Sequence, residues 1–288
     1  MIRLVTTLAA LALMASAPAA SAQGFREPEV RAALEAYGLG ALADTIAPAA
    51  RPAVIVDRSL LEREPGELGT TRLGGRPDLP AGTKWPRCHG YAQTFLAQLR
   101  LRDLPADAAE LNRHDGTVLF FAHIDRVDGS WNQPFSGECT TVVHARSGTP
   151  LRRAPFPRHA LRLRPALPRF DVRPDLPDTS SPTDRLMPPL HAVKLESSFA
   201  WNDVRDQLEG PQYRPHRVLG YSNSPAGGTP CSLRADRTIG TWRHLFTLGY
   251  DKRLGFAIER FGRVQFLISP SDLQAGRFER ACGVFDRY

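Results

Sequence analysis

The chain has 288 residues, 42% of them hydrophobic, and a formal net charge of +7 at pH 7. This length fits one large domain or two of ordinary size. The basic balance favours weak attraction to anionic partners without selecting one, and no stretch beyond the first residues reaches the roughly 18 uncharged apolar residues of a membrane-spanning helix.

The chain begins with a segment typical of an export signal. Arg3 supplies a positive charge, Leu4 to Met14 are mostly apolar, and Ala20-Ser21-Ala22 has the small residues of a cleavage site. We therefore expect residues 1–22 to be removed as a signal peptide. The remaining protein is expected to be exported to the periplasm or the medium, without a transmembrane segment.

The first part of the exported chain combines a helical and a strand-like pattern. Residues 23–52 are predicted to be an N-terminal helical segment, with a helix from Glu27 to Ile46 because its apolar side chains recur on one face. Residues 53–148 carry period-2 patterns, which are typical of strands. The predicted strands of this region are Ala53–Val56, Thr94–Leu101, Thr117–Ile124 and Thr140–His144.

Residues 149–190 are predicted to form a connector rich in proline and arginine. Ten of the 25 prolines lie between Pro150 and Pro189. Leu161 to Val172 still alternate apolar and basic residues, so we predict an edge strand interrupted by proline, which lacks the backbone donor that a central strand needs.

The last part, residues 191–288, repeats the mixture of helix and strand patterns. A helix is predicted around Phe199 to Leu208 and a short helix from about Ser271. The predicted strands are Trp242–Leu248, Leu254–Glu259 and Arg263–Ile268. Most connections are too short for helical crossovers between parallel strands, so we predict an α+β fold with mainly antiparallel β structure in one globular unit.

Landmarks of the first strand-rich region recur in the second. Arg72–Pro80 matches Arg217–Pro225 in its Arg, Gly and Pro residues at an offset of 145, and Gly116–Phe121 matches Gly262–Leu267 at 146. The cysteines recur at a similar offset, 143. Such a repeated spacing indicates an internal duplication that yields two similar halves, residues 53–148 and 191–288, packed together.

All four cysteines lie after the predicted signal. Cys88 and Cys139 are 51 residues apart, and so are Cys231 and Cys282. Because an even number of cysteines in an oxidising compartment is typical of disulfides, we predict the pairs Cys88–Cys139 and Cys231–Cys282. The alternative, a zinc site, lacks a close Cys-x-x-Cys pair, and we expect neither a metal nor a cofactor.

Several segments together resemble a known family. They are "RLGGRPDLPAGTKWP", "TFLAQLRLRDLP", "GTVLFFAHI", "HRVLGYSNSP", "WRHLFTLGYD" and "GRVQFLISPSDL". In this order they resemble the YwqG-like family, a bacterial domain of unknown function, from about Ala53 to the C-terminus. The resemblance implies a mainly β, α+β fold and brings no agreed activity or catalytic set. The chain departs from the family pattern at "GYSNSP", where the family tends to have a Pro soon after the Gly, and in its export signal and paired cysteines.

Motifs that would indicate catalysis are weak. "GYSNS", Gly220 to Ser224, lacks the second Gly of a nucleophile elbow, and "GLGALA", Gly38 to Ala43, does not follow a strand as a dinucleotide fingerprint must. His123 and Asp125 lie two apart on a predicted strand, so they would point to the same side and could share a metal or a proton. The alternative for this pair is a solvated strand end.

Arginine residues provide the clearest candidate for binding. Seven of them, with Asp171 as the one acid among them, lie close together at positions 152, 153, 158, 162, 164, 169 and 173. The planar guanidinium suits phosphate, sulfate or carboxylate, and Arg162 and Arg164 are expected to share one strand face. The alternative is a basic edge strand protected against aggregation.

The stretch Arg72–Cys88 is too rich in glycine and proline for a regular element and too apolar for a solvated linker. We interpret it as a rigid arm laid over the sheet, because proline fixes an extended path and Trp85 offers an apolar anchor. The functional alternative is a wall of a binding site, in which Arg76 or Asp78 contacts the ligand.

The sequence therefore favours a non-catalytic binding protein over an enzyme. The expected partner is an anionic envelope component, such as an acidic glycan or a lipid head group, or another protein. Nucleic acid is not expected, because a base-stacking motif is missing from the sequence. The alternative function is a hydrolase whose site lies in the cleft between the two halves.

Overall fold

The structure is a computed structural model. It describes residues 24–127, 130–132, 139–158, 160–176, 199–210, 216–222, 242–258 and 262–287. The predicted signal peptide, Cys231 and most of residues 177–241 lie outside these ranges. No helix in the described ranges is long and apolar enough to cross a membrane.

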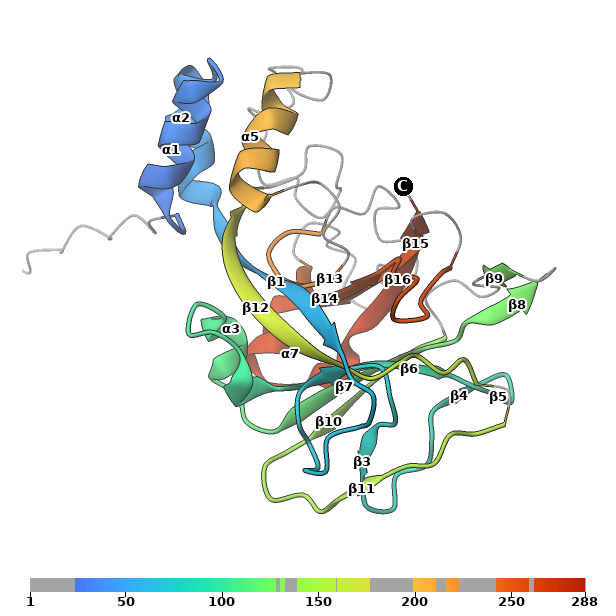
Figure 1. The fold of residues 1–288 in the computed structure, drawn as a ribbon. Coiled ribbons are helices and arrows are strands. Elements are labelled where there is room, and N and C mark those ends of the chain that lie inside the picture. Colours follow the sequence, from blue (N-terminus) through green and yellow to red (C-terminus); the bar gives the residue numbers. More distant parts are fainter. Residues whose placement is uncertain are drawn as a thin grey trace, which may run out of the picture.

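A ten-stranded sheet organises the fold, with the strand order β10-β7-β6-β2-β12-β1-β13-β14-β15-β16 (Figure 1). Its strands are β1 (Arg51–Leu60), β2 (Arg72–Leu73), β6 (Thr94–Arg100), β7 (Thr117–Ala122), β10 (Thr140–Ala145), β12 (Ala166–Asp175), β13 (His216–Leu219), β14 (Arg243–Gly249), β15 (Gly262–Ile268) and β16 (Cys282–Arg287). Every pairing in this sheet is antiparallel. The predicted class, α+β with mainly antiparallel sheet, is confirmed.

Shorter strands form three two-stranded sheets beside the large one. They are β3 (Asp78–Pro80) with β11 (Leu151–Arg153), β4 (Arg87–Cys88) with β5 (Tyr91–Ala92), and β8 (Asp125–Val127) with β9 (Ser130–Asn132). The arm from Arg72 to Cys88 thus contains β3 and β4. Trp85 anchors it, because its ring centroid lies 5.9 Å from that of Phe121 and its Nε1 donates to the carbonyl of Gln93 at 2.8 Å.

The large sheet curls until its two end strands approach one another. The amide of Gly283 in β16 donates to Oγ1 of Thr140 in β10 at 2.9 Å, and a Cβ on Gly283 would lie 2.3 Å from that threonine's Cγ2. Inside the curl, the ring of Phe120 lies 4.7 Å from that of Phe246 and 5.0 Å from that of Phe266. Each such fully buried side chain stabilises the fold by about 1.5 to 3 kcal/mol.

Strands β1 and β12 form a long ribbon in the middle of this sheet (Figure 1). The ribbon pairs with β2 only at Ala166 and with β13 only over Ala53 to Ile55. The prediction of an edge strand at Leu161–Val172 was wrong in position, because β12 lies between two strands. Pro168 and Pro174 are nevertheless tolerated there, since most of β12 has a partner on one side only.

Three helices lie together beyond one end of this ribbon (Figure 1). They are α1 (Glu27–Ala36), α2 (Ala43–Ile46) and α5 (Phe199–Glu209). Val30, Ile46 and Trp201 belong to the small apolar core between them. The single helix predicted from Glu27 to Ile46 was too long: α1 stops before Gly38, whose φ of 75° no right-handed helix contains. Two 3-10 turns, at Gly40–Leu42 and Ala47–Ala49, flank α2.

Two short helices, α3 (Ala109–Asn112) and α7 (Pro270–Gln274), contact each other. Two 3-10 turns, at Leu101–Asp103 and Phe278–Arg280, adjoin them in the chain. Ser269 caps α7, because its Oγ accepts the amide of Asp272 at 3.1 Å. The helix expected near Ser271 is therefore confirmed.

A strand predicted at Leu254–Glu259 was wrong. The described part of this segment is a tight turn, closed by an isolated bridge between Asp251 and Phe256. The Asp251 carboxylate accepts the amides of Arg253 and Leu254 at 2.9 and 3.1 Å, which holds the turn in place of a strand ladder.

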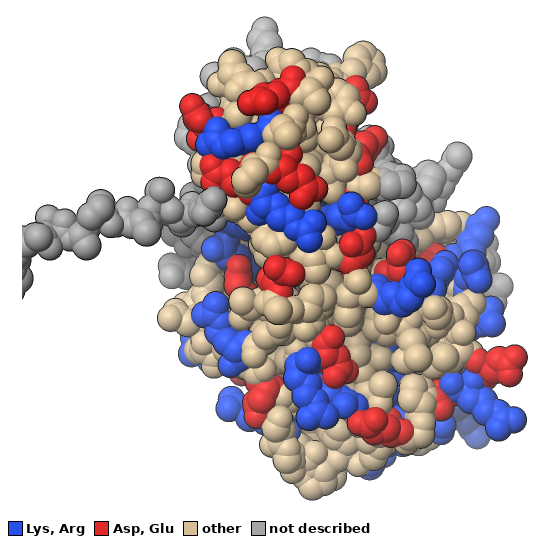
Figure 2. All heavy atoms as spheres, turned by 60° about the vertical axis from the view of Figure 1, so that its left-hand side comes forward, with Lys and Arg blue, Asp and Glu red and all other residues tan. Residues whose placement is uncertain are grey.

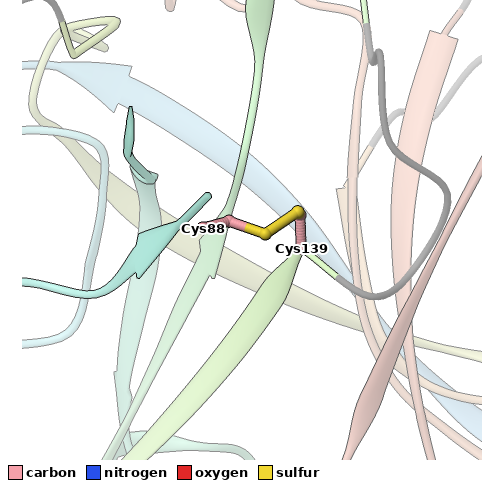
Figure 3. The surroundings of a disulfide bond; sticks show 2 residues. All are labelled: Cys88 and Cys139. Atoms are coloured by element: carbon pink, nitrogen blue, oxygen red, sulfur yellow. A yellow bond between two sulfur atoms is a disulfide. The ribbon is translucent and has the colours of Figure 1, made fainter. Parts of the chain in front are cut away.

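The first predicted disulfide is confirmed. Cys88 in β4 is bonded to Cys139, directly before β10, with their Cα atoms 5.4 Å apart (Figure 3). Cys282 is also disulfide-bonded. Its predicted partner, Cys231, lies outside the described residues.

Candidate functional site

Two of the arginines proposed as ligand contacts lie exposed on the surface. Arg162 and Arg164 alternate with the buried Leu161 and Leu163. They belong to the irregular segment before β12 and not to a strand. The Arg162 guanidinium lies over the Phe156 ring, 5.1 Å from its centroid.

A turn from the C-terminal part of the chain extends this basic surface. The amide of Arg164 donates to the carbonyl of Leu254 at 2.8 Å, which places the exposed Lys252 and Arg253 beside the two arginines. We call Arg162, Arg164, Lys252 and Arg253 the basic patch. Within the described residues, none of these four cations has a carboxylate within 4.0 Å.

Asp251, the acidic residue at the start of this turn, is buried and paired within the protein. Its carboxylate accepts Nε of Arg58 at 2.5 Å and Nε2 of His216 at 3.2 Å. Burial opposes its ionisation, yet the hydrogen bonds from His216 and Arg58 hold the pKa of Asp251 well below its ordinary value. The side chain thus stays charged and neutralises Arg58 without reducing the charge of the basic patch.

The other two sequence-predicted ligand residues already have partners within the protein. Arg76 pairs with Glu64, with 2.7 Å between Nε and Oε2. Asp78 is fully buried and accepts Nη1 of Arg72 and Nε of Arg153, each at 2.8 Å. Burial alone would raise the pKa of Asp78, but the two guanidinium groups lower it to about 2. Its position in the interior is the reason that Asp78 contacts other residues instead of a surface ligand.

The remaining arginines of the predicted cluster do not form one surface. The half-buried Arg153 pairs with Asp78, Arg152 donates to the carbonyl of Thr83 at 3.4 Å, and Arg173 pairs with Asp171 at 2.8 Å. On the face shown in Figure 2, acidic and basic side chains are interspersed. The excess positive charge is therefore not gathered over that face.

His123 and Asp125, the weak catalytic candidates, lie at the end of β7 and the start of β8. His123 is buried, with its ring 5.7 Å from that of the exposed Tyr91. The side chain of Asp125 lies outside the described residues. Their cooperation stays a prediction.

A buried polar cluster, which sequence reasoning missed, lies on one face of the C-terminal strands. Arg217, Thr247 and Gln265 are in register across β13, β14 and β15 and are all buried. Arg217 donates to Asp175 at 3.0 Å and lies 3.6 Å from Glu209. Burying polar side chains costs free energy unless they are hydrogen-bonded, so a buried row of them marks a candidate site.

Glu209, at the end of α5, has an unusual environment. Burial and the negative charge of Asp175 raise its pKa to about 7, against the pairing with Arg205 at 3.0 Å. A carboxyl group with this pKa can gain or lose a proton near neutral pH. The cluster therefore contains one group able to change charge in the physiological range.

A hydroxyl and an imidazole also meet in this cluster. Oγ1 of Thr247 lies 2.6 Å from Nε2 of His244, whose Nδ1 donates to the carbonyl of Leu219 at 2.7 Å. In catalytic sites a hydroxyl nucleophile and its imidazole base lie at such a distance. However, burial lowers the pKa of His244 to about 3, so the imidazole is a weak base at neutral pH. The geometry favours a satisfied interior histidine.

One group of potential metal ligands occurs in the described part of the chain. The ligand atoms of Cys88, His89 and Cys139 all lie within 4.8 Å of one another. Because the two sulfur atoms are joined in the disulfide, neither is a thiolate available to a metal.

A family model described as "Domain of unknown function (DUF1963)" matches residues 71–286. The chain belongs to the DUF1963 family. The DUF1963 match begins just before β2 and ends in β16, and it leaves β1 and the N-terminal helices outside. It is consistent with the YwqG-like resemblance and assigns no activity. No curated protein matches the chain.

Proposed function

We propose that this DUF1963 protein binds an anionic ligand through the basic patch and catalyses no reaction on it. The observation that carries the proposal is the group of four exposed cations without a carboxylate partner among the described residues. Arginine forks bind carboxylate, sulfate and phosphate oxygens in pairs, so the ligand class is an acidic glycan or an anionic lipid head group.

The patch is held in place before any ligand arrives. Arg162 rests on the ring of Phe156, and the backbone of Arg164 is fixed by its hydrogen bond to Leu254. A preorganised cation loses less conformational freedom on binding than a mobile one. This supports recognition by these two arginines over general attraction by the net charge.

Export to the periplasm or the medium belongs to this proposal. The disulfide Cys88–Cys139 is compatible with an oxidising compartment, and the first 22 residues have the composition of a signal peptide. In that compartment the basic patch would meet acidic glycans and lipid head groups of the cell envelope.

We further infer that the sheet arose by internal duplication. Strands β2-β6-β7-β10 run outward from one side of the central ribbon, and β13-β14-β15-β16 run outward from the other. β1 precedes the first set in the chain yet pairs with β13, and β12 precedes the second set yet pairs with β2. Each set of four thus extends from the ribbon strand that precedes the other set in the chain.

Backbone angles at the aligned landmarks support the same inference. Gly74 and Leu219, at the offset of 145, both have a φ of 59°, and the following residues, Gly75 and Gly220, have φ of 71° and 81°. A leucine in this left-handed region costs about 1 to 2 kcal/mol. An inherited turn explains why Leu219 occupies a position that suits glycine.

The experiment compares a patch variant, Arg162→Ser/Arg164→Ser, with a charge-matched control, Arg87→Ser/Arg102→Ser, whose arginines are also exposed. Binding is measured by calorimetry with polygalacturonate and by co-sedimentation with phosphatidylglycerol vesicles, with dextran and phosphatidylcholine as neutral probes. We expect the parent and the control to bind an anionic probe in a salt-sensitive way and the patch variant to bind at least about tenfold more weakly.

Equal loss in the control and the patch variant would show that net charge alone governs binding. Absence of binding to both anionic probes by the parent would overturn the proposal.

A further inference from the structure

A polar pocket lies between segments of the two strand-rich regions, and none of its lining residues belongs to the basic patch. It has a volume of about 340 Å³. Its wall consists of the end of α3 and the residues after it, the end of β10, and the residues that follow α7. The helices α3 and α7 contact each other. The lining residues are Asn112, Arg113, His114, Asp115, His144, Arg146, Ala275 and Gly276.

Two imidazoles in this wall are held in fixed orientations. The rings of His114 and His144 pack edge-on against the fully buried Phe278, with centroids 5.3 and 4.9 Å from it. Nε2 of His144 donates to the carbonyl of Asp115 at 2.8 Å, and the ring of His114 hydrogen-bonds the backbone of Leu273. Each ring is thereby oriented by one nitrogen.

The other ring nitrogens have no hydrogen-bond partner among the described residues. For His114 this atom is Nε2, which is buried in the wall, and for His144 it is Nδ1. Oδ1 of Asn112 is likewise buried without a partner, while its Nδ2 donates to the carbonyl of Pro105 at 2.7 Å. Unsatisfied polar atoms of this kind are uncommon in native proteins and call for an explanation.

Two further cations, Arg113 and Arg146, lie exposed at the pocket. Neither has a carboxylate within ion-pair distance in the described part of the chain. Their guanidinium groups come from different elements, one after α3 and one after β10. An anion in the pocket would therefore connect two segments that are distant in sequence.

We propose that this pocket binds a small hydroxylated acid, a sugar acid or a sugar phosphate, with its anionic group held by Arg113 and Arg146 and a hydroxyl group held by His144. A hydroxyl is both donor and acceptor, so it suits an imidazole nitrogen in either protonation state. The volume is at the small end of ligand pockets, which fits a single sugar unit better than a polymer. This site is separate from the basic patch and does not depend on the function proposed for it.

Calorimetry with four probes tests the proposal: glucuronate, glucose 6-phosphate, glucose and inorganic phosphate. The parent is compared with Arg113→Ser/Arg146→Ser, with Ala275→Phe, which fills the pocket from an exposed position and keeps every charge, and with the control Arg87→Ser/Arg102→Ser. Circular dichroism confirms that each variant is folded. The patch variant, Arg162→Ser/Arg164→Ser, separates this site from the one proposed above.

We expect glucuronate or glucose 6-phosphate to bind the parent, the control and the patch variant alike. Both pocket variants should lose at least about tenfold in affinity. The preferred probe identifies the anionic group as carboxylate or phosphate. Absence of binding by both acids, binding of inorganic phosphate alone, or equal affinity in the parent and both pocket variants would each overturn the proposal.

Discussion

Replacing Asp78 by Asn tests a fully buried carboxylate that is paired with two arginines. Asp78 is fully buried between Arg72 and Arg153 and also accepts the amide of Gly69 at 2.9 Å and Nε2 of Gln98 at 3.0 Å. The amide of Asn would remove the negative charge and leave the Arg72 guanidinium buried without a counter-charge.

The size of the effect follows from two independent considerations. The pKa of Asp78 falls from its ordinary 3.8 to about 2, which corresponds to about 2 kcal/mol of stability that the charged form contributes. Removing one partner of a buried ion pair costs about 3 to 5 kcal/mol, because the remaining charge is uncompensated. We therefore expect Asp78→Asn to lower the free energy of unfolding at pH 7 by about 3 to 5 kcal/mol.

Acid should reduce the difference in unfolding free energy between the parent and Asp78→Asn. Because the folded-state pKa is lowered, the contribution of Asp78 is fully present above about pH 4 and is lost as the pH falls through about 2. Urea unfolding followed by tryptophan fluorescence at pH 7, 4 and 2.5 measures it, with the exposed Asp107→Asn as the control, expected within about 0.5 kcal/mol of the parent. A loss below about 1 kcal/mol at pH 7, or a difference that does not narrow in acid, would refute the reasoning.

Three further predictions concern stability. Replacing both Cys88 and Cys139 by Ser should lower the free energy of unfolding by roughly 2 to 4 kcal/mol in urea titrations, and an unchanged midpoint would contradict it. Gly220→Ala should cost about 3 to 5 kcal/mol, since its Cβ would lie 2.2 Å from a buried carboxylate oxygen, whereas Gly82→Ala, with a similar φ and open space, should cost about 1 to 2 in the same assay. Below pH 6.5 the unfolded chain protonates His244, while the folded protein does not until about pH 3. This group should therefore lower the free energy of unfolding by about 2 kcal/mol between pH 6.5 and 5. His244→Gln should flatten the dependence of stability on pH in this range, and an unchanged dependence would exclude His244 as its cause.

Local patterns in the sequence predicted most strands, because a half-buried strand and its period of two are properties of adjacent residues. The strand predicted at Thr117–Ile124, for example, is β7, Thr117–Ala122. Equal spacing also predicted the Cys88–Cys139 bond. Local patterns could not place β12 in the middle of the sheet, since its position depends on pairing with β1, more than a hundred residues earlier.

The buried polar cluster was missed for the same reason. Asp175, Arg217, His244 and Gln265 come from four different strands, and no two of them are close in sequence. Arg217 was noticed only as a counterpart of Arg72. Conversely, Asp78 looked available to a ligand because a sequence does not show which carboxylates are buried against arginine.

The binding function proposed above is consistent with the contacts of the buried polar groups. Asp78 is held by two guanidinium groups, and the His244 imidazole is oriented by a carbonyl and a hydroxyl, so a change of protonation in either would break contacts that stabilise the fold. Arg162 and Arg164, in contrast, are fixed by an aromatic ring and a backbone hydrogen bond that leave their charge without a carboxylate partner in the described residues. An anion bound there would gain charge-assisted hydrogen bonds and would disrupt no ion pair among the described residues.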